Sequence, residues 1–215
     1  MSMDEPAEQL RLRALARAGD ANAFGELFDS CAKAVYNHAF RLIGDWSAAE
    51  DLMAQTFLEA WRSRERIAAD GGSLRPWLLG IATNLARGHR RASRRQVAAL
   101  LRLGPPPDIP DFSDDVTGRL DDANRIAVLQ RSLSRLRPDE FEVLALCAWS
   151  DLSYPEAAEA LGVPVGTVRS RLSRARAKLL KATERERQRN SRELTTKIDQ
   201  LVDRTANADP SCKEA

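Results

Sequence analysis

The stretch "LSYPEAAEALGVPVGTVRSRLSRARAKL" (152–179) predicts two helices that meet at a tight turn. Ser153 and Glu156 have the Ser-x-x-Glu spacing of a capping box, in which each side chain accepts a hydrogen bond from the backbone of the other residue. Gly162 can adopt the left-handed backbone that commonly ends a helix. A short helix, a tight turn and a second helix are typical of a helix-turn-helix.

The second helix of this stretch is predicted to have one apolar face and one basic face. Apolar residues recur at intervals of three and four, which predicts that they face a core: Val165, Val168, Leu172, Ala175 and Leu179. In a helix-turn-helix this helix enters the major groove of DNA, where arginine can bind guanine through two hydrogen bonds. The candidate DNA contacts on the other face are Thr167, Arg169, Ser170, Arg171, Arg174 and Arg176. A basic face exposed only to solvent is the alternative interpretation.

The net charge of +2 hides a strong segregation of charge along the chain. Residues 87–102 include six arginines and no carboxylate, whereas residues 108–122 include six aspartates and one arginine. From residue 169 to residue 181 every charged side chain is again positive. Clustered arginine is the electrostatic pattern of phosphate binding, so two basic blocks flanking an acidic connector indicate a nucleic-acid-binding protein.

The composition favours helices, because Ala, Leu and Arg are frequent and no segment has the period of a strand. We predict an all-α fold of two small helical domains joined by an extended acidic linker, since "LGPPPDIPDFSDD" (103–115) carries four prolines that lack a backbone donor. The expected segments are an N-terminal helical lead-in (1–20), a first domain (21–95), a Pro/Asp-rich linker (96–124), a second domain (125–182) and a C-terminal extension, part helix and then disordered (183–215).

Local signals predict where several helices begin and end. Breaks are expected at Gly44-Asp45 and at residues 70–73, where glycine and polar residues interrupt the first helical region. Pro138 occupies a position suited to the first turn of a helix. That helix is predicted to turn four side chains inward, which are Phe141, Leu144, Ala145 and Ala148.

Several classes of protein are disfavoured by the sequence. No apolar stretch is long enough to span a bilayer, so we expect no membrane insertion and a cytoplasmic location. The three cysteines are far apart and lack partners at ligand spacing, so neither a metal nor any other cofactor is expected. The absence of a P-loop, of a carboxylate constellation and of a nucleophile with a partner histidine argues against an enzyme.

The first half of the chain carries a family resemblance. The segments "AEDLMAQTFLEAWR" (49–62) and "LRPWLLGIATNLARGHRR" (74–91), preceded by "AGDANAFGELF" (18–28) and "VYNHAFRLIGD" (35–45), resemble the second conserved region of bacterial RNA polymerase sigma factors. The helix-turn-helix stretch (152–179) resembles the fourth region. Both regions occur in the right order without an intervening third domain, which resembles the two-domain extracytoplasmic-function group of the sigma-70 family.

This resemblance implies a function and a set of partners. A member of the group binds core RNA polymerase and directs promoter-specific initiation of transcription, while the polymerase performs the catalysis. The helix-turn-helix reads the minus-thirty-five element as duplex, and the second region melts the minus-ten element and reads it largely as single strand. The implied partners are the β′ clamp and the β flap of core polymerase, promoter DNA and an anti-sigma factor.

The resemblance also implies site residues in the second region. A polar stripe is expected to contact the β′ clamp and consists of Asp51, Gln55, Glu59 and Arg62. Capture of a flipped base of the minus-ten element is expected to use Asn84 and the loop "RERIAADGGS" (64–73), which includes Ile67. The phosphates beside the melted segment would be held by Arg87, Arg90 and Arg91, with Arg94 and Arg95 beside them.

Two other functions stay open on the residues alone. A helix-turn-helix regulator that binds DNA without polymerase, usually as a symmetric dimer, would explain the second half but not the motifs of the first. A regulatory scaffold that binds polymerase without promoter recognition would explain the first half. Mutation of Arg171 and Arg174 separates the scaffold from the sigma factor, because only the sigma factor needs both for transcription.

Overall fold

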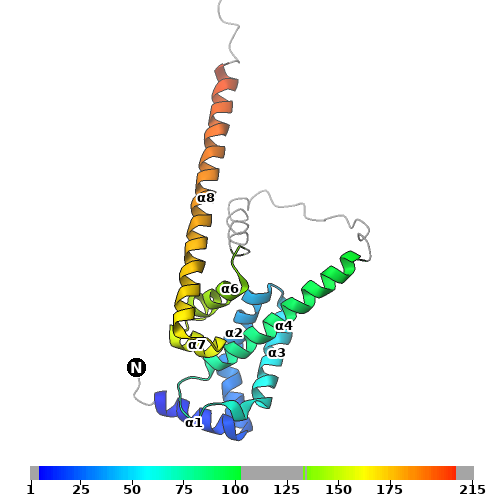
Figure 1. Cartoon of the computed structure of the whole chain (residues 1–215), viewed down its shortest axis with the longest axis vertical. Coiled ribbons are helices and arrows are strands. Elements are labelled where there is room, and N and C mark those ends of the chain that lie inside the picture. Colours follow the sequence, from blue (N-terminus) through cyan, green and yellow to red (C-terminus); the bar gives the residue numbers. More distant parts are fainter. Residues whose placement is uncertain (1–4, 103–132, 134, 207–215) are drawn as a thin grey trace, which may run out of the picture. The chain divides into compact units, whose positions relative to one another are not determined.

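The computed structural model describes residues 5–102, 133 and 135–206 of the chain (Figure 1). Over these residues it contains α-helices and no strand, which confirms the predicted all-α class. The α-helices are α1 (Glu5–Ala18), α2 (Ala21–Ile43), α3 (Trp46–Arg62), α4 (Arg75–Arg102), α6 (Pro138–Leu144), α7 (Tyr154–Leu161) and α8 (Val165–Ala206). A 3₁₀ turn, η1 (Arg64–Arg66), follows α3, and a π-helical turn, η2 (Ala145–Trp149), follows α6. None of the helices in these ranges combines the length and the apolar character needed to cross a membrane.

The chain divides into two compact units. The first comprises Met1–Ser113 and Pro138–Leu172, and therefore holds α1 to α4, α6, α7 and the first two turns of α8. The second comprises Asp114–Arg137 and Ser173–Ala215, of which the structure describes chiefly the remainder of α8. The Pro/Asp-rich segment 103–132, where the linker is predicted, lies outside the described residues. The candidate minus-ten and core-polymerase residues all belong to the first unit.

Polar caps explain why α2 and α3 begin and end where they do. The Asp20 side chain accepts a hydrogen bond from the backbone of Ala23 at 2.8 Å, and Asp45 accepts one from Ala48 at 2.7 Å. Between the two helices Gly44 has a φ of 80°, a left-handed conformation that favours glycine. The predicted break at Gly44-Asp45 is confirmed, and the short connection brings α2 and α3 into contact.

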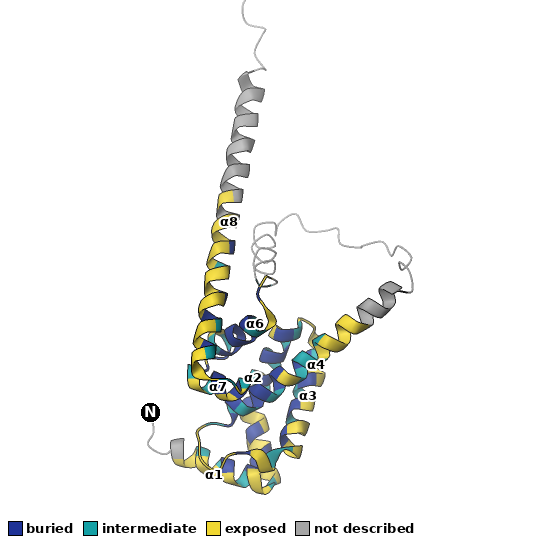
Figure 2. Ribbon diagram, in the orientation of Figure 1, coloured by how far each residue is buried: buried dark blue, intermediate teal, exposed yellow. Residues whose placement is uncertain are grey.

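The core of the first domain lies among α2, α3 and α4 (Figure 2). Their buried apolar side chains recur at intervals of three and four, as expected for helices that each turn one face inward. Burial of each leucine contributes about 1.5–3 kcal/mol to the free energy of unfolding. These buried side chains include Leu27, Val35, Leu52, Leu78 and Leu79.

A single glycine lets α4 and α7 touch through their backbones. A Cβ atom at Gly80 would lie 2.4 Å from the carbonyl oxygen of Ala160 and 3.1 Å from its carbonyl carbon. Real Cβ contacts are not that short, so no side chain fits at this position without a shift of the α7 backbone. A separate contact joins α2 to the end of η2, where Arg41 Nη1 donates a hydrogen bond to the carbonyl oxygen of Trp149 at 3.1 Å.

A buried histidine links α2 with α4 and with the end of η2. His38 is fully buried, with Nε2 2.9 Å from the Thr83 hydroxyl and Nδ1 3.4 Å from the Ser150 hydroxyl. The Thr83 hydroxyl donates its proton to the carbonyl of Leu79, so His38 Nε2–H must be the donor to Thr83. Nδ1 is then left as the acceptor for Ser150. The neutral ring uses both nitrogens, and burial, assisted by the charge of Arg41, lowers the pKa of His38 to about 3.

This buried histidine predicts a loss of stability in mild acid. Below its ordinary pKa of 6.5 the imidazole takes up a proton in the unfolded chain but not in the folded one. The free energy of unfolding therefore falls as the pH drops from 6.5 toward 3, by up to about 1.4 kcal/mol per pH unit from this group. Urea unfolding at pH 7, 6 and 5 should show a steeper fall for the wild type than for His38→Gln. The exposed His89→Gln control should keep the wild-type slope, and equal slopes for all three proteins would contradict the prediction.

Two helices continue beyond the expected domain boundaries. The prediction of which side chains face inward in the helix that starts at Pro138 is partly wrong. Helix α4 runs to Arg102 rather than ending near residue 95, and α8 continues as one helix to Ala206. In the segment that starts at Pro138, Leu144 and Ala145 are buried as predicted, but Phe141 is half-buried and Ala148 is exposed. The π-helical turn η2 widens the helix from Ala145 to Trp149, which rotates Ala148 away from its position in the α-helical pattern.

Candidate nucleic-acid interface

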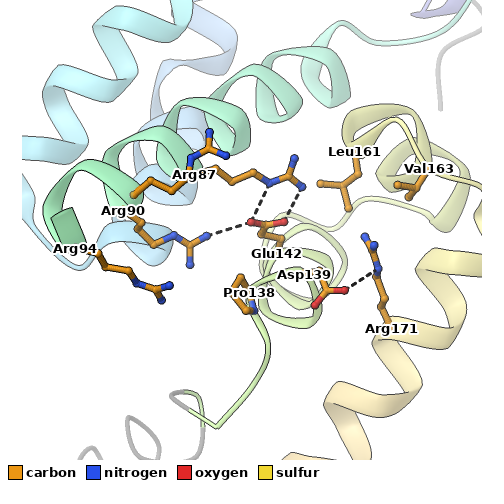
Figure 3. Close-up of a pocket in the computed structure, with 10 residues that line it drawn as sticks. Arg87, Arg90, Arg94, Pro138, Asp139, Glu142, Leu161, Val163 and Arg171 are labelled. Carbon is orange, nitrogen blue, oxygen red and sulfur yellow. Dashed lines mark hydrogen bonds and ion pairs between the residues drawn. The ribbon is translucent and has the colours of Figure 1, made fainter. Parts of the chain in front are cut away.

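The candidate minus-ten residues of α4 lie at helical spacing, so the helix itself gathers them on one side. Four arginines of this set line a cavity of about 400 Å³ (Figure 3). They are Arg87, Arg90, Arg91 and Arg94. Across the cavity lie residues from α6, the α7 end and the start of α8, which are Pro138, Asp139, Glu142, Leu161, Val163 and Arg171. Five arginines and two acidic residues therefore line the cavity.

The carboxylate of Glu142 binds two of these arginines from the floor of the cavity. Arg87 grips it with two hydrogen bonds, Nε to Oε1 at 3.0 Å and Nη2 to Oε2 at 2.7 Å, and Arg90 Nη2 adds a third at 3.2 Å. Glu142 is only 2% exposed, so these bonds offset the cost of removing its charge from water. The same bonds raise the pKa of Arg87, whereas burial lowers the pKa of Arg90. Two guanidinium groups expected to bind phosphate are thus bound to an acid of the chain itself.

The remaining candidate minus-ten residues differ in exposure. Asn84 is exposed, and its amide oxygen accepts a hydrogen bond from Arg87 Nη1 at 2.9 Å, so the structure brings Asn84, Arg87 and Arg90 together. Arg91 is exposed on the same helix, as are Arg94 and Arg95. Ile67, by contrast, is 3% exposed and packs in the core below the loop. The buried side chain of Ile67 anchors the loop in the core, and it is therefore not accessible to DNA in this structure.

The helix-turn-helix signals are confirmed in detail. The Ser153 backbone donates to Glu156 Oε2 at 2.8 Å, and the Glu156 backbone donates to Ser153 Oγ at 3.4 Å, which completes the capping box of α7. Gly162 ends α7 with a φ of 63°. At the start of α8, Val168 and Leu172 are buried as predicted, but Val165, which was also predicted to face the core, is 36% exposed in the first turn of the helix.

The candidate minus-thirty-five residues lie on the other side of α8, where most are accessible. Arg169, Ser170, Arg174 and Arg176 are exposed, and Thr167 and Arg171 are half-buried. Arg171 pairs with Asp139 at the start of α6, with Nε 3.2 Å from Oδ2. The Asp139 carboxylate and DNA would therefore compete for this guanidinium.

The candidate core-polymerase residues form an exposed stripe along α3. Asp51, Gln55, Glu59 and Arg62 are all exposed, at intervals of four, four and three. Asp51 and Gln55 also border a smaller hollow of about 220 Å³ between α3 and α4. Three large apolar side chains on this helix, Trp46, Leu58 and Trp61, are exposed as well. Mixed polar and apolar exposure of this kind is typical of a protein-binding face.

Two residues important to this interface were missed by the sequence interpretation. Glu142 lies within an apolar run of α6, and a carboxylate among apolar neighbours is a signal of a buried ion pair that could have been read. Arg13 of α1 is buried against the loop 64–73, but its sequence context of alternating Arg, Leu and Ala carries no such signal.

Family models match both halves of the chain: a Sigma-70 region 2 model matches residues 27–96, and a Sigma-70 region 4 model matches residues 126–179. The chain is 32% identical over 180 residues to the RNA polymerase sigma factor NccH of Alcaligenes xylosoxydans xylosoxydans, covering 82% of this chain and 95% of NccH. It is 34% identical over 180 residues to the ECF RNA polymerase sigma factor SigE of Mycolicibacterium smegmatis, covering 82% of this chain and 67% of SigE.

A solved structure agrees with these matches. The co-crystal structure of the sigma factor RpoE with the anti-sigma factor NepR from Bartonella quintana superposes with a TM-score of 0.56 at 25% sequence identity. The alignment covers 75% of this chain and 96% of that one. With both regions matched in order, on an all-α fold in which region 4 contains the helix-turn-helix, the chain belongs to the extracytoplasmic-function group of sigma-70 factors, which bind core RNA polymerase and direct promoter-specific initiation of transcription.

Proposed function

We propose that this sigma factor captures the minus-ten element on the exposed side of α4. The observation that carries the proposal is the grouping of three side chains on α4: Asn84 is hydrogen-bonded to Arg87, Arg87 and Arg90 share the carboxylate of Glu142, and Arg91 follows one residue further on. Asn84 presents both a donor and an acceptor, which suits the edge of an unstacked base. The arginines supply positive charge for the adjoining phosphates. Ile67 contributes indirectly, by anchoring the loop 64–73 in the core.

Phosphate and Glu142 compete for Arg87 and Arg90. Arg87 gives two of its five guanidinium N–H groups to Glu142 and Arg90 gives one, and the carboxylate neutralises part of their positive charge. The ion pairs with Glu142 therefore weaken the attraction of these two arginines for DNA phosphates. This competition supports a sigma factor whose α4 arginines become more available when α6 moves away from α4.

The other contacts are assigned to α8 and α3. Duplex minus-thirty-five DNA is read at the start of α8, where the candidate residues are Thr167, Arg169, Ser170, Arg171, Arg174 and Arg176. The β′ clamp of core polymerase is contacted by the stripe of α3, which consists of Asp51, Gln55, Glu59 and Arg62. The exposure of both faces supports these assignments. The second domain also contacts the β flap.

The protein acts in the cytoplasm with its polymerase, catalyses no reaction itself and is held in check by an anti-sigma factor. RpoE of Bartonella quintana, which shares this fold, was crystallised with the anti-sigma factor NepR. The shared arrangement of regions 2 and 4 supports a partner of the same class for this chain. An anti-sigma factor would act by covering the faces assigned above to DNA or to polymerase.

The first test is run-off transcription with purified protein and core polymerase that lacks any sigma factor, on a pool of genomic promoter fragments. Transcript starts that share two upstream elements are the expected result. The double variant Arg171→Ala with Arg174→Ala should lower transcription from these promoters about thirtyfold or more, because each arginine–guanine contact contributes roughly 1–3 kcal/mol and two are lost.

The matched control removes two positive charges further along the same helix. Lys181→Ala with Arg185→Ala changes exposed residues outside the assigned contacts, and its transcription should stay within about twofold of the wild type. Specific starts that persist unchanged in the Arg171 and Arg174 variant would overturn the minus-thirty-five assignment. Co-migration with core polymerase but no specific starts would instead favour a polymerase-binding scaffold.

A further inference from the structure

Helix α1 contributes a buried arginine that holds the loop 64–73 from below. Arg13 is 3% exposed; its Nε donates to the carbonyl of Ala68 and its Nη1 to the carbonyl of Gly72, both at 2.8 Å. The nearest carboxylate, Glu159, is 4.0 Å from Nη2, and its side chain is 56% exposed. A buried guanidinium needs strong partners to offset its desolvation, and here the two short bonds go to loop carbonyls.

The loop conformation is matched to this arginine. Gly71, between the two bound carbonyls, has a φ of 127°, which strains any other residue. A Cβ atom at Gly71 would also lie 3.0 Å from both Cζ and Nη2 of Arg13. Residues 68–72 therefore form a short arch, and the guanidinium of Arg13 bridges its two ends. The buried apolar side chain of Ile67 anchors the chain immediately before this arch.

The top of the arch faces solvent while its base is fixed. Ala69, Asp70 and Gly71 are exposed, and α4 starts four residues after Gly71. The backbone of Arg75 at that start donates to Ser73 Oγ at 3.1 Å. The loop is thus attached at both ends and underneath, and the exposed residues between these points are held in one conformation.

We propose that Arg13 is a positioning residue that sets the shape of this loop and thereby the base preference of the sigma factor at the minus-ten element. The proposal rests on the assignment of the loop 64–73 to base capture. Arg13 itself touches no DNA, because its side chain is buried beneath the loop. It lies in α1, before the residues matched by the region 2 model, so the specificity of the loop depends on a helix outside that match.

The physical reason is preorganisation. A flipped base is bound more tightly and more selectively by a site that is already in its binding conformation. Binding then requires no free energy to order the site. Loss of two charge-assisted hydrogen bonds lets the arch adopt several conformations, each suited to a different base. We expect Arg13→Ala to lower transcription about tenfold at the preferred minus-ten sequence and by less at other sequences, so that the base preference flattens.

The test uses the full-length protein with core polymerase and a promoter library randomised across the minus-ten element, read by sequencing the transcripts. The variants are Arg13→Ala, Arg13→Lys, which keeps the charge but not the two-pronged geometry, and Gly71→Ala, which strains the loop and presses a Cβ against the guanidinium while keeping Arg13 itself. All three should flatten the base preference, with Arg13→Lys between the other two and the wild type. The control is Arg11→Ala, two residues before Arg13 on the exposed side of α1, and it should keep the base preference of the wild type.

Separate measurements distinguish positioning from simple loss of folding. Core-polymerase affinity and urea unfolding report whether each variant is folded, and Arg13→Lys is the mildest of the set. A lower yield of transcripts with an unchanged base profile would overturn the proposal, because that is the signature of lost stability alone. A loop variant, Asp70→Ala, tests the assignment of the loop to base capture. If Asp70→Ala changes the base preference but Arg13→Lys and Arg13→Ala do not, the role of Arg13 is rejected and the assignment of the loop stands. Unchanged profiles in every variant reject both.

Discussion

Removal of Arg87 and Arg90 together is expected to lower the free energy of unfolding by about 3–5 kcal/mol, because it leaves the buried carboxylate of Glu142 without its partners. The carboxylate is 2% exposed and cannot regain water without separating α6 from α4. Urea unfolding of Arg87→Ala with Arg90→Ala measures the loss. The control Arg94→Ala with Arg95→Ala removes the same charge from exposed positions of α4 and should cost at most about 0.5 kcal/mol for each residue.

A triple variant separates the structural role of these arginines from their role in DNA binding. Addition of Glu142→Gln to the double variant removes the stranded charge, so most of the lost stability should return. Binding to a single-stranded minus-ten oligonucleotide should not return, because the guanidinium groups are still absent. If the triple variant is as unstable as the double variant, the destabilisation does not come from Glu142.

The single variant Glu142→Gln should have the opposite effect on DNA. With a neutral amide in place of the carboxylate, Arg87 and Arg90 are no longer held by an ion pair, and the affinity of the protein for the minus-ten oligonucleotide should rise about tenfold, which corresponds to about 1.4 kcal/mol. Fluorescence anisotropy at two salt concentrations measures it. Glu50→Gln, an equal change of charge on the exposed face of α3, should alter the affinity by less than about twofold. Equal affinities for both variants would contradict a competition between Glu142 and phosphate.

Gly80→Ala is the second substitution with a large expected effect. Its Cβ would lie 2.4 Å from the carbonyl oxygen of Ala160, so α7 must move away from α4. We expect the free energy of unfolding to fall by about 2 kcal/mol, since the overpacking outweighs the better helix propensity of alanine. Urea unfolding measures the change, and hydrogen exchange of the α7 amides shows whether the contact with α4 opens first.

Gly88→Ala is the matched control on the same helix. No atom lies within 4 Å of a Cβ at Gly88, so only the propensity gain applies and the protein should become about 0.5–1 kcal/mol more stable. The two variants carry the same chemical change eight residues apart and should differ by about 3 kcal/mol. Equal stabilities would show that α4 and α7 are not in contact through Gly80 in solution.

Local signals allowed the sequence to predict the elements of the helix-turn-helix and its family. The capping box of Ser153 and Glu156 and the terminating Gly162 act over three or four residues, so spacing alone is informative. The burial of Val168 and Leu172 follows from helical periodicity. The grouping of Asn84, Arg87 and Arg90 also follows from spacing, because residues three and four apart on a helix are neighbours.

Contacts between distant residues were decided only by the tertiary structure. The pairing of Arg87 with Glu142 joins positions 55 apart, and the bond from Arg13 to Ala68 also spans 55 positions. Position 80 needs a glycine because the backbone of Ala160 lies against it, and no local sequence pattern indicates that contact. Periodicity reports which side of a helix is apolar but not which helix will cover it. The sequence by itself therefore determined the class, the family and the basic faces of this sigma factor, whereas the fold decided which arginines are bound by Glu142 and which loop Arg13 holds.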